Sequence, residues 1–231
     1  MRSHIQFGSK RIDFKLEYTD RRSLGITVTP DLLVIVKAPA GSTLDQVKIK
    51  LQRKAPWIIK QQNYFLSFQP KMPPRKYVSG ETHLYLGRQY RLKVIDGNID
   101  DVKLRGKFIE VITTNRPRVK ALLHAWYLDH ASDKFSRIAQ PLIDRFKKYK
   151  VEPKSIQLRA MPARWGSCTP KGKIILNPDL IRAPKACIEY VIIHELCHLV
   201  YHEHSQRFID LQTREMKDWE KWKEKLERLL A

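Results

Sequence analysis

The most constraining feature of this sequence is an apolar segment, YVIIHELCHLV at residues 190–200, that contains two histidines and one glutamate. A helix formed by this segment would be apolar on nearly all sides, which is typical of a helix buried in a core. Burying His194, Glu195 and His198 in such a helix is costly unless strong partners compensate them. A metal ion is such a partner, so the fold is expected to build a buried helix around a metal site.

His194, Glu195 and His198 fit the H-E-x-x-H pattern of metal-dependent hydrolases. Histidines four positions apart lie on one face of a helix, one turn apart, so both imidazoles can bind a single ion. Bound zinc lowers the pKa of a water molecule to about 7, and the glutamate can take a proton from that water. The alternative is a pair of buried histidines with structural partners only, because a five-residue match also arises by chance.

The third metal ligand is a choice between His202, Glu203 and His204. On an unbroken helix His202 would lie about 12 Å along the axis from His194, which is too far for one ion. The helix is therefore expected to end first, and Ser205 is a favourable N-cap for a second helix after a bend. A histidine just past that bend can return to the ion, so we favour His204 and expect His202 at the surface or behind the ligands.

The first part of the chain, residues 1–115, has mainly the patterns of strands. Alternating and short apolar runs predict strands within three segments, 24–36, 83–95 and 107–113. Residues 44–66 have helical spacing, and Pro56 is expected to break that helix. The Pro-rich segment 70–74 is a candidate linker.

The second part, residues 116–231, has mainly helical spacing. A long amphipathic helix is expected up to Phe146, with a kink at Pro141. Two short strands are expected within 156–168 and 173–177, and a closing helix is expected within 216–230. The helix of the histidines completes this part. These patterns predict an α+β fold, either as a β-rich part followed by a helical part or as one continuous domain.

The formal charge is +20, and the first 150 residues carry +17 of it. A basic surface favours polyanions, so nucleotide or nucleic-acid contact through the basic N-terminal part is one expectation. Because the lysines and arginines are dispersed, a generally solvated basic surface explains the charge equally well.

Three observations predict a cytoplasmic protein with no membrane partner. No apolar run approaches the roughly 18 residues that cross a bilayer. The N-terminal residues lack the apolar region of a secretory signal. The three cysteines have no paired framework and are expected to be free thiols: Cys168, Cys187 and Cys197.

Several segments resemble the YgjP-like metallopeptidases, which are relatives of the SprT-like zincins. The resembling segments are RWGSC (164–168), ILNPDLIRAP (175–184), YVIIHELCHL (190–199), HSQRF (204–208), the strand pair 24–39, YLGRQYRL (85–92) and DWEKWKEKLE (218–227). The resemblance implies one zinc ion in a zincin-like catalytic part at residues 116–231, with Glu195 as the catalytic base. It also implies that the zinc ligands are His194, His198 and His204. Two positions depart from the family pattern, Glu203 and Ile209.

The segment from Arg164 to Cys168 has both a functional and a structural interpretation. Gly166 allows a close approach of the backbone, and a strand here could present its edge to an extended substrate. Arg164 could stabilise a developing oxyanion. The alternative is packing alone, with Arg164 paired to a carboxylate.

Three functions are compatible with these residues. The first is zinc-dependent hydrolysis of a peptide or protein, with Glu195 as general base. The second uses the same site on the phosphoanhydride of a nucleoside triphosphate, which the basic part would attract. The third is a non-enzymatic nucleic-acid-binding protein with a structural zinc. Two points weaken it: Glu195 would have no role, and three protein ligands leave an open position that is typical of catalytic zinc, whereas structural zinc has four protein ligands. No Gly-rich phosphate cradle accompanies the motif, which favours the peptidase.

Overall fold

A computed structural model describes residues 1–21, 23–29, 31–66, 75–161 and 164–230. The chain forms two compact units, Met1–Pro73 and Pro74–Leu230, which are described separately. The expected boundary at residue 115 does not coincide with this division, because the strands before 115 share a core with the helices after it. The candidate linker at 70–74 lies outside the described residues.

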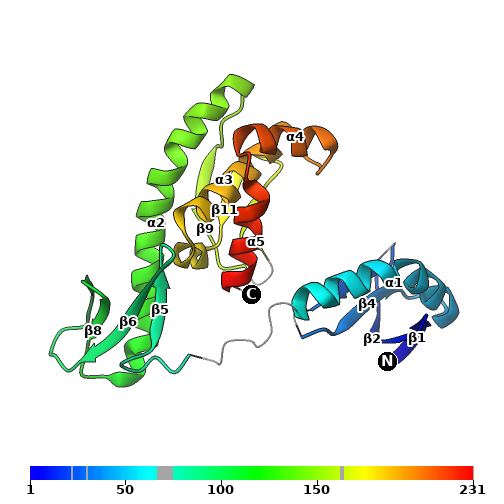
Figure 1. Cartoon of the computed structure of the whole chain (residues 1–231), viewed down its shortest axis with the longest axis horizontal. Helices are drawn as coiled ribbons and strands as arrows, with labels where there is room; N and C mark the ends of the chain where they lie inside the picture. Colours follow the sequence, from blue (N-terminus) through cyan, green and yellow to red (C-terminus); the bar gives the residue numbers. More distant parts are fainter. Residues whose placement is uncertain (22, 30, 67–74, 162–163, 231) are drawn as a thin grey trace. The chain divides into compact units, whose positions relative to one another are not determined.

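The first unit is a four-stranded sheet with one helix. The strands are β1 (Arg2–Phe7), β2 (Lys10–Thr19), β3 (Gly25–Val28) and β4 (Val34–Pro39), in the order β1-β2-β4-β3. β2 and β4 are parallel, and the other two pairs are antiparallel. Helix α1 (Leu44–Leu66) lies along the sheet, and its apolar residues share a core with one face of the strands (Figure 1).

Helix α1 is continuous, so the predicted break at Pro56 is wrong. Pro56 removes one backbone hydrogen bond, the one that would end at the carbonyl of Gln52. Both residues are on the exposed side of the helix, where water can satisfy that carbonyl. Burial of Ala55 and Ile58 beside the proline keeps the helix together.

The second unit begins with another four-stranded sheet. Its strands are β5 (Thr82–Tyr85), β6 (Arg88–Ile95), β7 (Asp101–Arg105) and β8 (Phe108–Ile112), in the order β5-β6-β8-β7. The segment with strand patterns at 83–95 forms a hairpin of β5 and β6. Leu86 and Gly87 form its two-residue turn, with φ angles of 48° and 79°.

The tip of this hairpin contacts the chain just before the helix of the histidines. The amide of Leu86 donates to the carbonyl of Ile181 (2.8 Å), and that of Gly87 donates to the carbonyl of Arg182 (3.0 Å). A Cβ atom at residue 87 would lie 2.6 Å from the ring of Pro184, so only glycine allows this approach. The hairpin therefore fixes the position at which the next helix begins.

The remainder of the second unit contains four helices and a three-stranded sheet. The helices are α2 (Val119–Phe146), α3 (Lys185–Val200), α4 (Gln206–Glu215) and α5 (Trp219–Leu230), with short 3₁₀ turns η1 (Arg116–Arg118), η2 (Lys147–Tyr149) and η3 (Pro178–Arg182). The sheet is β10-β11-β9, from β9 (Ser155–Leu158), β10 (Gly166–Cys168) and β11 (Lys173–Leu176). The stretch predicted as one strand at 156–168 is therefore two strands, on opposite sides of β11.

Helix α3 is the centre of this unit. It packs against α2, α4, α5 and the strands β10 and β11, and most of its residues are buried. The fold is α+β, as predicted, and the cysteines are free: Cys187 and Cys197 are buried and Cys168 is half-buried. Across the described residues, every helix is too short or too polar to traverse a lipid bilayer.

Candidate metal centre

Helix α3 ends where the ligand argument requires. Its last residue is Val200, and the backbone of Tyr201 is extended, so the chain leaves the helix one residue before His202. Helix α4 then begins at Gln206, with Ser205 in the N-cap position, although the Ser205 hydroxyl makes no capping hydrogen bond. The predicted bend between the two helices is confirmed, and His204 lies within it.

The bend brings His204 back to the two histidines of α3. One ligand atom from each of His194, His198 and His204 lies within 4.8 Å of the others. The Nε2 atoms of His194 and His204 are 3.2 Å apart. Two nitrogens that share a tetrahedral zinc ion at about 2.0–2.1 Å are roughly 3.3 Å apart, so this donor set fits such an ion. His202 lines the same cavity but is not part of the group.

The other ring nitrogens of the α3 histidines are hydrogen-bonded to the protein. His194 Nδ1 lies 2.8 Å from Oε1 of Gln212, and His198 Nδ1 lies 3.2 Å from the carbonyl of Tyr201. A carbonyl oxygen only accepts, so each Nδ1 carries the proton and each Nε2 keeps its lone pair. Burial lowers the pKa of His194 to about 4 and lowers that of His198, which keeps both rings neutral, the form that binds a metal.

Gln212 was not found from the sequence. It lies on α4, 1% exposed, and fixes the tautomer and orientation of His194 from 18 positions away. Nothing in the sequence marks this glutamine, because the contact depends on how α4 packs on α3.

Glu195 lies next to the histidines and against strand β10. It is 5% exposed, and burial raises its pKa to about 7, while the backbone N–H of Cys168 and the charge of Arg164 lower it. A Cβ atom at residue 166 would lie 2.6 Å from Oε1 of Glu195. Gly166 is therefore required for the carboxylate to occupy this place, and the expected close approach at Gly166 is confirmed.

A cavity of about 720 Å³ opens over these groups. Its lining residues come from α3, the bend and the segment 164–170 that contains β10, and they include the three histidines, Glu195, Arg164 and His202. β10 pairs only with β11, so within the described residues its other edge has no strand partner. Buried Asn177 holds the segment before β10 by donating to the carbonyls of Met161 (2.9 Å) and Arg164 (3.1 Å).

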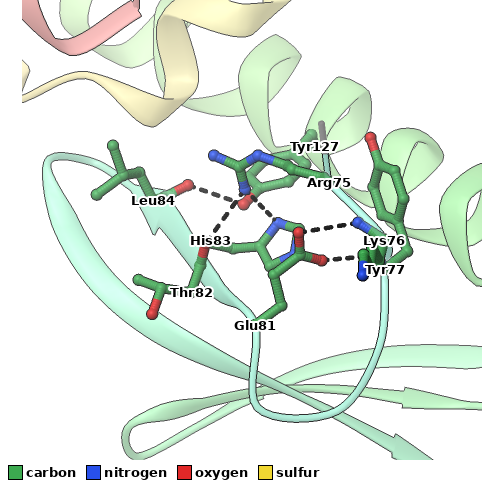
Figure 2. A network of polar contacts seen from close by, with 8 residues as sticks. All are labelled: Arg75, Lys76, Tyr77, Glu81, Thr82, His83, Leu84 and Tyr127. Carbon is green, nitrogen blue, oxygen red and sulfur yellow. Dashed lines mark hydrogen bonds and ion pairs between the residues drawn. The ribbon is translucent and has the colours of Figure 1, made fainter. Parts of the chain in front are cut away.

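His83, a fully buried histidine in the same unit, has different surroundings (Figure 2). Nδ1 of His83 lies 2.7 Å from Nη1 of Arg75, and Nε2 lies 3.3 Å from Oε2 of Glu81. Because arginine only donates, Nδ1 is the acceptor and the Nε2 proton goes to Glu81. Glu81 also accepts from the amides of Lys76 and Tyr77. Burial, and then the charge of Arg75, lower the pKa of His83 to about 4.

Comparison with known proteins identifies the chain at the level of a family. The model of the YgjP-like metallopeptidase domain matches residues 22–229, which is nearly the whole chain. Among curated proteins and among solved structures, none matches this chain. A metallopeptidase domain implies a metal, and the histidine group described above could bind one. With its histidine group and its matched domain, the chain belongs to the YgjP-like metallopeptidase family.

Proposed function

We propose that the protein is a peptidase that binds one zinc ion through His194, His198 and His204 and uses Glu195 as its general base. The observation that carries the proposal is the spacing of the histidine nitrogens beside a buried carboxylate in one cavity. Zinc at this position would supply a Lewis acid that polarises the substrate carbonyl and activates water.

Glu195 provides the proton transfer. Its pKa of about 7 means that the carboxylate can take a proton from water near neutral pH and deliver it to the leaving amine. Gly166 and the amide of Cys168 fix the carboxylate in place. Arg164, at the same cavity, supplies positive charge that would stabilise a negative carbonyl oxygen.

The free edge of β10 supports a peptide substrate. An extended peptide can add to such an edge through backbone hydrogen bonds, which would align its scissile bond with Glu195. A nucleoside triphosphate instead needs several cations around its phosphates. Among the described residues that line the cavity, Arg164 is the only lysine or arginine. This charge balance favours a peptide over a triphosphate.

The test compares Glu195→Gln with a matched control, Glu189→Gln, on the same helix. Glu189 pairs with Lys185 rather than with the site. We expect Glu195→Gln to keep one zinc by elemental analysis and to lose about 10²–10⁴-fold in the hydrolysis of an unfolded protein. The control variant, Glu189→Gln, should retain both the zinc and the hydrolytic activity. Loss of zinc in Glu195→Gln would make Glu195 a ligand, and cleavage of triphosphates alone would reject the peptidase.

A further inference from the structure

Helix α1 of the first unit has four basic side chains around an exposed tryptophan. Lys50, Arg53, Lys54 and Lys60 are exposed, and Trp57 between them is 42% exposed. Spacings of three, four and seven positions from the tryptophan place all five residues on one side of the helix. This cationic stripe extends about 15 Å along the helix axis.

The cations of the stripe have no acidic partners. Within the described residues, none of the four forms an ion pair, and Asp45, the one acidic residue of α1, lies in its first turn on another side. The open face of the sheet in the same unit is different. There Arg11 pairs with Asp13 (3.0 Å), and a lysine of the same strand pairs with a glutamate, Lys15 with Glu17 (2.8 Å).

We propose that the cationic stripe binds single-stranded nucleic acid. Lysine and arginine side chains neutralise phosphates, and an exposed indole ring offers a surface on which a base can stack. Residues 1–73 contain 13 lysines and arginines against five acidic residues, so the whole unit attracts a polyanion. Charge attraction alone does not explain why an exposed tryptophan lies among unpaired cations, whereas stacking of a base on the Trp57 ring does.

An anionic membrane surface is the weaker candidate. A helix that binds a bilayer inserts its apolar face among the lipids. The apolar face of α1 is already covered by the sheet, since Val47, Leu51, Ala55 and Ile58 are at most 1% exposed. The exposed large apolar residues of α1 are Ile49, Trp57 and Leu66, and they lie eight and nine positions apart, so they form no continuous apolar face for insertion.

The first experiment measures binding of the full chain to a fluorescent single-stranded oligonucleotide of mixed sequence over a range of salt concentrations. One variant changes Lys50, Arg53, Lys54 and Lys60 to glutamine. We expect it to bind at least about tenfold more weakly at low salt, and the slope of log affinity against log salt to decrease by about 3. The control changes the same number of cations on the sheet: Arg2, Arg11, Lys15 and Lys37. Its slope should change by less than 1.

The second experiment tests the stacking surface. Trp57→Ala should weaken binding of the oligonucleotide about tenfold and leave binding of an abasic strand of equal length unchanged. Circular dichroism and zinc content check that each variant is folded. No binding by the wild-type chain, equal losses in the two glutamine variants, or an unchanged affinity in Trp57→Ala would each overturn the proposal. So would vesicles of anionic lipid that bind as tightly through the same residues.

Discussion

The second unit contains histidines in two kinds of surroundings: His83 is fully buried, and His194 and His198 are half-buried. Both nitrogens of His83 have partners in the protein, Arg75 on one side and Glu81 on the other. His194 and His198 each have one such partner, a carbonyl oxygen at Nδ1. Their remaining nitrogens meet a third histidine, His204, with no acidic side chain in the group.

This difference shows what separates a structural histidine from a candidate ligand. Burial lowers the pKa of His83 and of His194 to the same value, about 4, so burial alone does not distinguish them. The distinction lies in the second nitrogen. The second ring nitrogen of His83 is hydrogen-bonded within the protein, whereas that of His194 remains available for an ion.

The largest effect is expected from His204→Ala. The variant removes one of three proposed ligands, so the affinity for zinc should fall by more than about 100-fold. Competition with a chelator, followed by elemental analysis, measures this. Stoichiometric zinc in the variant at low nanomolar free metal would show that His204 is not a ligand.

A smaller loss is expected from Gln212→Leu. Without the carbonyl of Gln212, His194 loses the partner that fixes its ring, and zinc affinity should fall about 10–100-fold. Gln206→Leu, on the exposed side of the same helix, is the matched control, because the side-chain amide of Gln206 donates to Asp210. Equal affinities in the two variants would mean that Gln212 has no positioning role.

His83 should affect stability rather than metal binding. Between its unfolded pKa of 6.5 and its folded pKa of about 4, the unfolded chain binds a proton that the folded chain does not. The free energy of unfolding should therefore fall as the pH drops from 6.5 to 4, by about 1–3 kcal/mol from this group.

Chemical denaturation of the wild type and of His83→Gln at several pH values tests this contribution. The glutamine variant should be less stable at pH 8 and should lose less stability on acidification. Zinc affinity at pH 8 should be the same in both. Parallel pH profiles would remove His83 from the group of histidines that stay neutral in the fold.

The smallest effect is expected from His202→Ala. His202 is exposed and follows the end of α3, so zinc affinity should change by less than about threefold. Isothermal titration with zinc measures it beside His204→Ala. A loss as large as that of His204→Ala would mean that His202 also binds the ion.

The sequence predicted the features of the centre that depend on local geometry. The spacing of His194 and His198, and the helix length that excludes His202, led to the bend and to His204. The close approach at Gly166 was also expected. Gln212 could not be predicted, because its contact with His194 depends on the packing of two helices.

The differences between the expected and the observed fold have the same origin. Pro56 disfavours a helix locally, but burial on both sides of it outweighs the lost hydrogen bond. Residues 83–95 form one apolar pattern, yet the turn at Leu86 and Gly87 divides them. The boundary near 115 follows a real change of pattern, but the strands before it pack on the helix after it.

The contact between Gly87 and Pro184 gives the hairpin a mechanical role. Helix α3 is a rigid rod that begins beside Pro184, and His198 lies about 20 Å along it. Such a rod acts as a lever: a tilt of about 3° at its start would move His198 by about 1 Å, a displacement that can cost an enzyme about 100-fold in rate. The position of the histidines on α3 therefore depends partly on a turn that lies about a hundred residues earlier in the sequence.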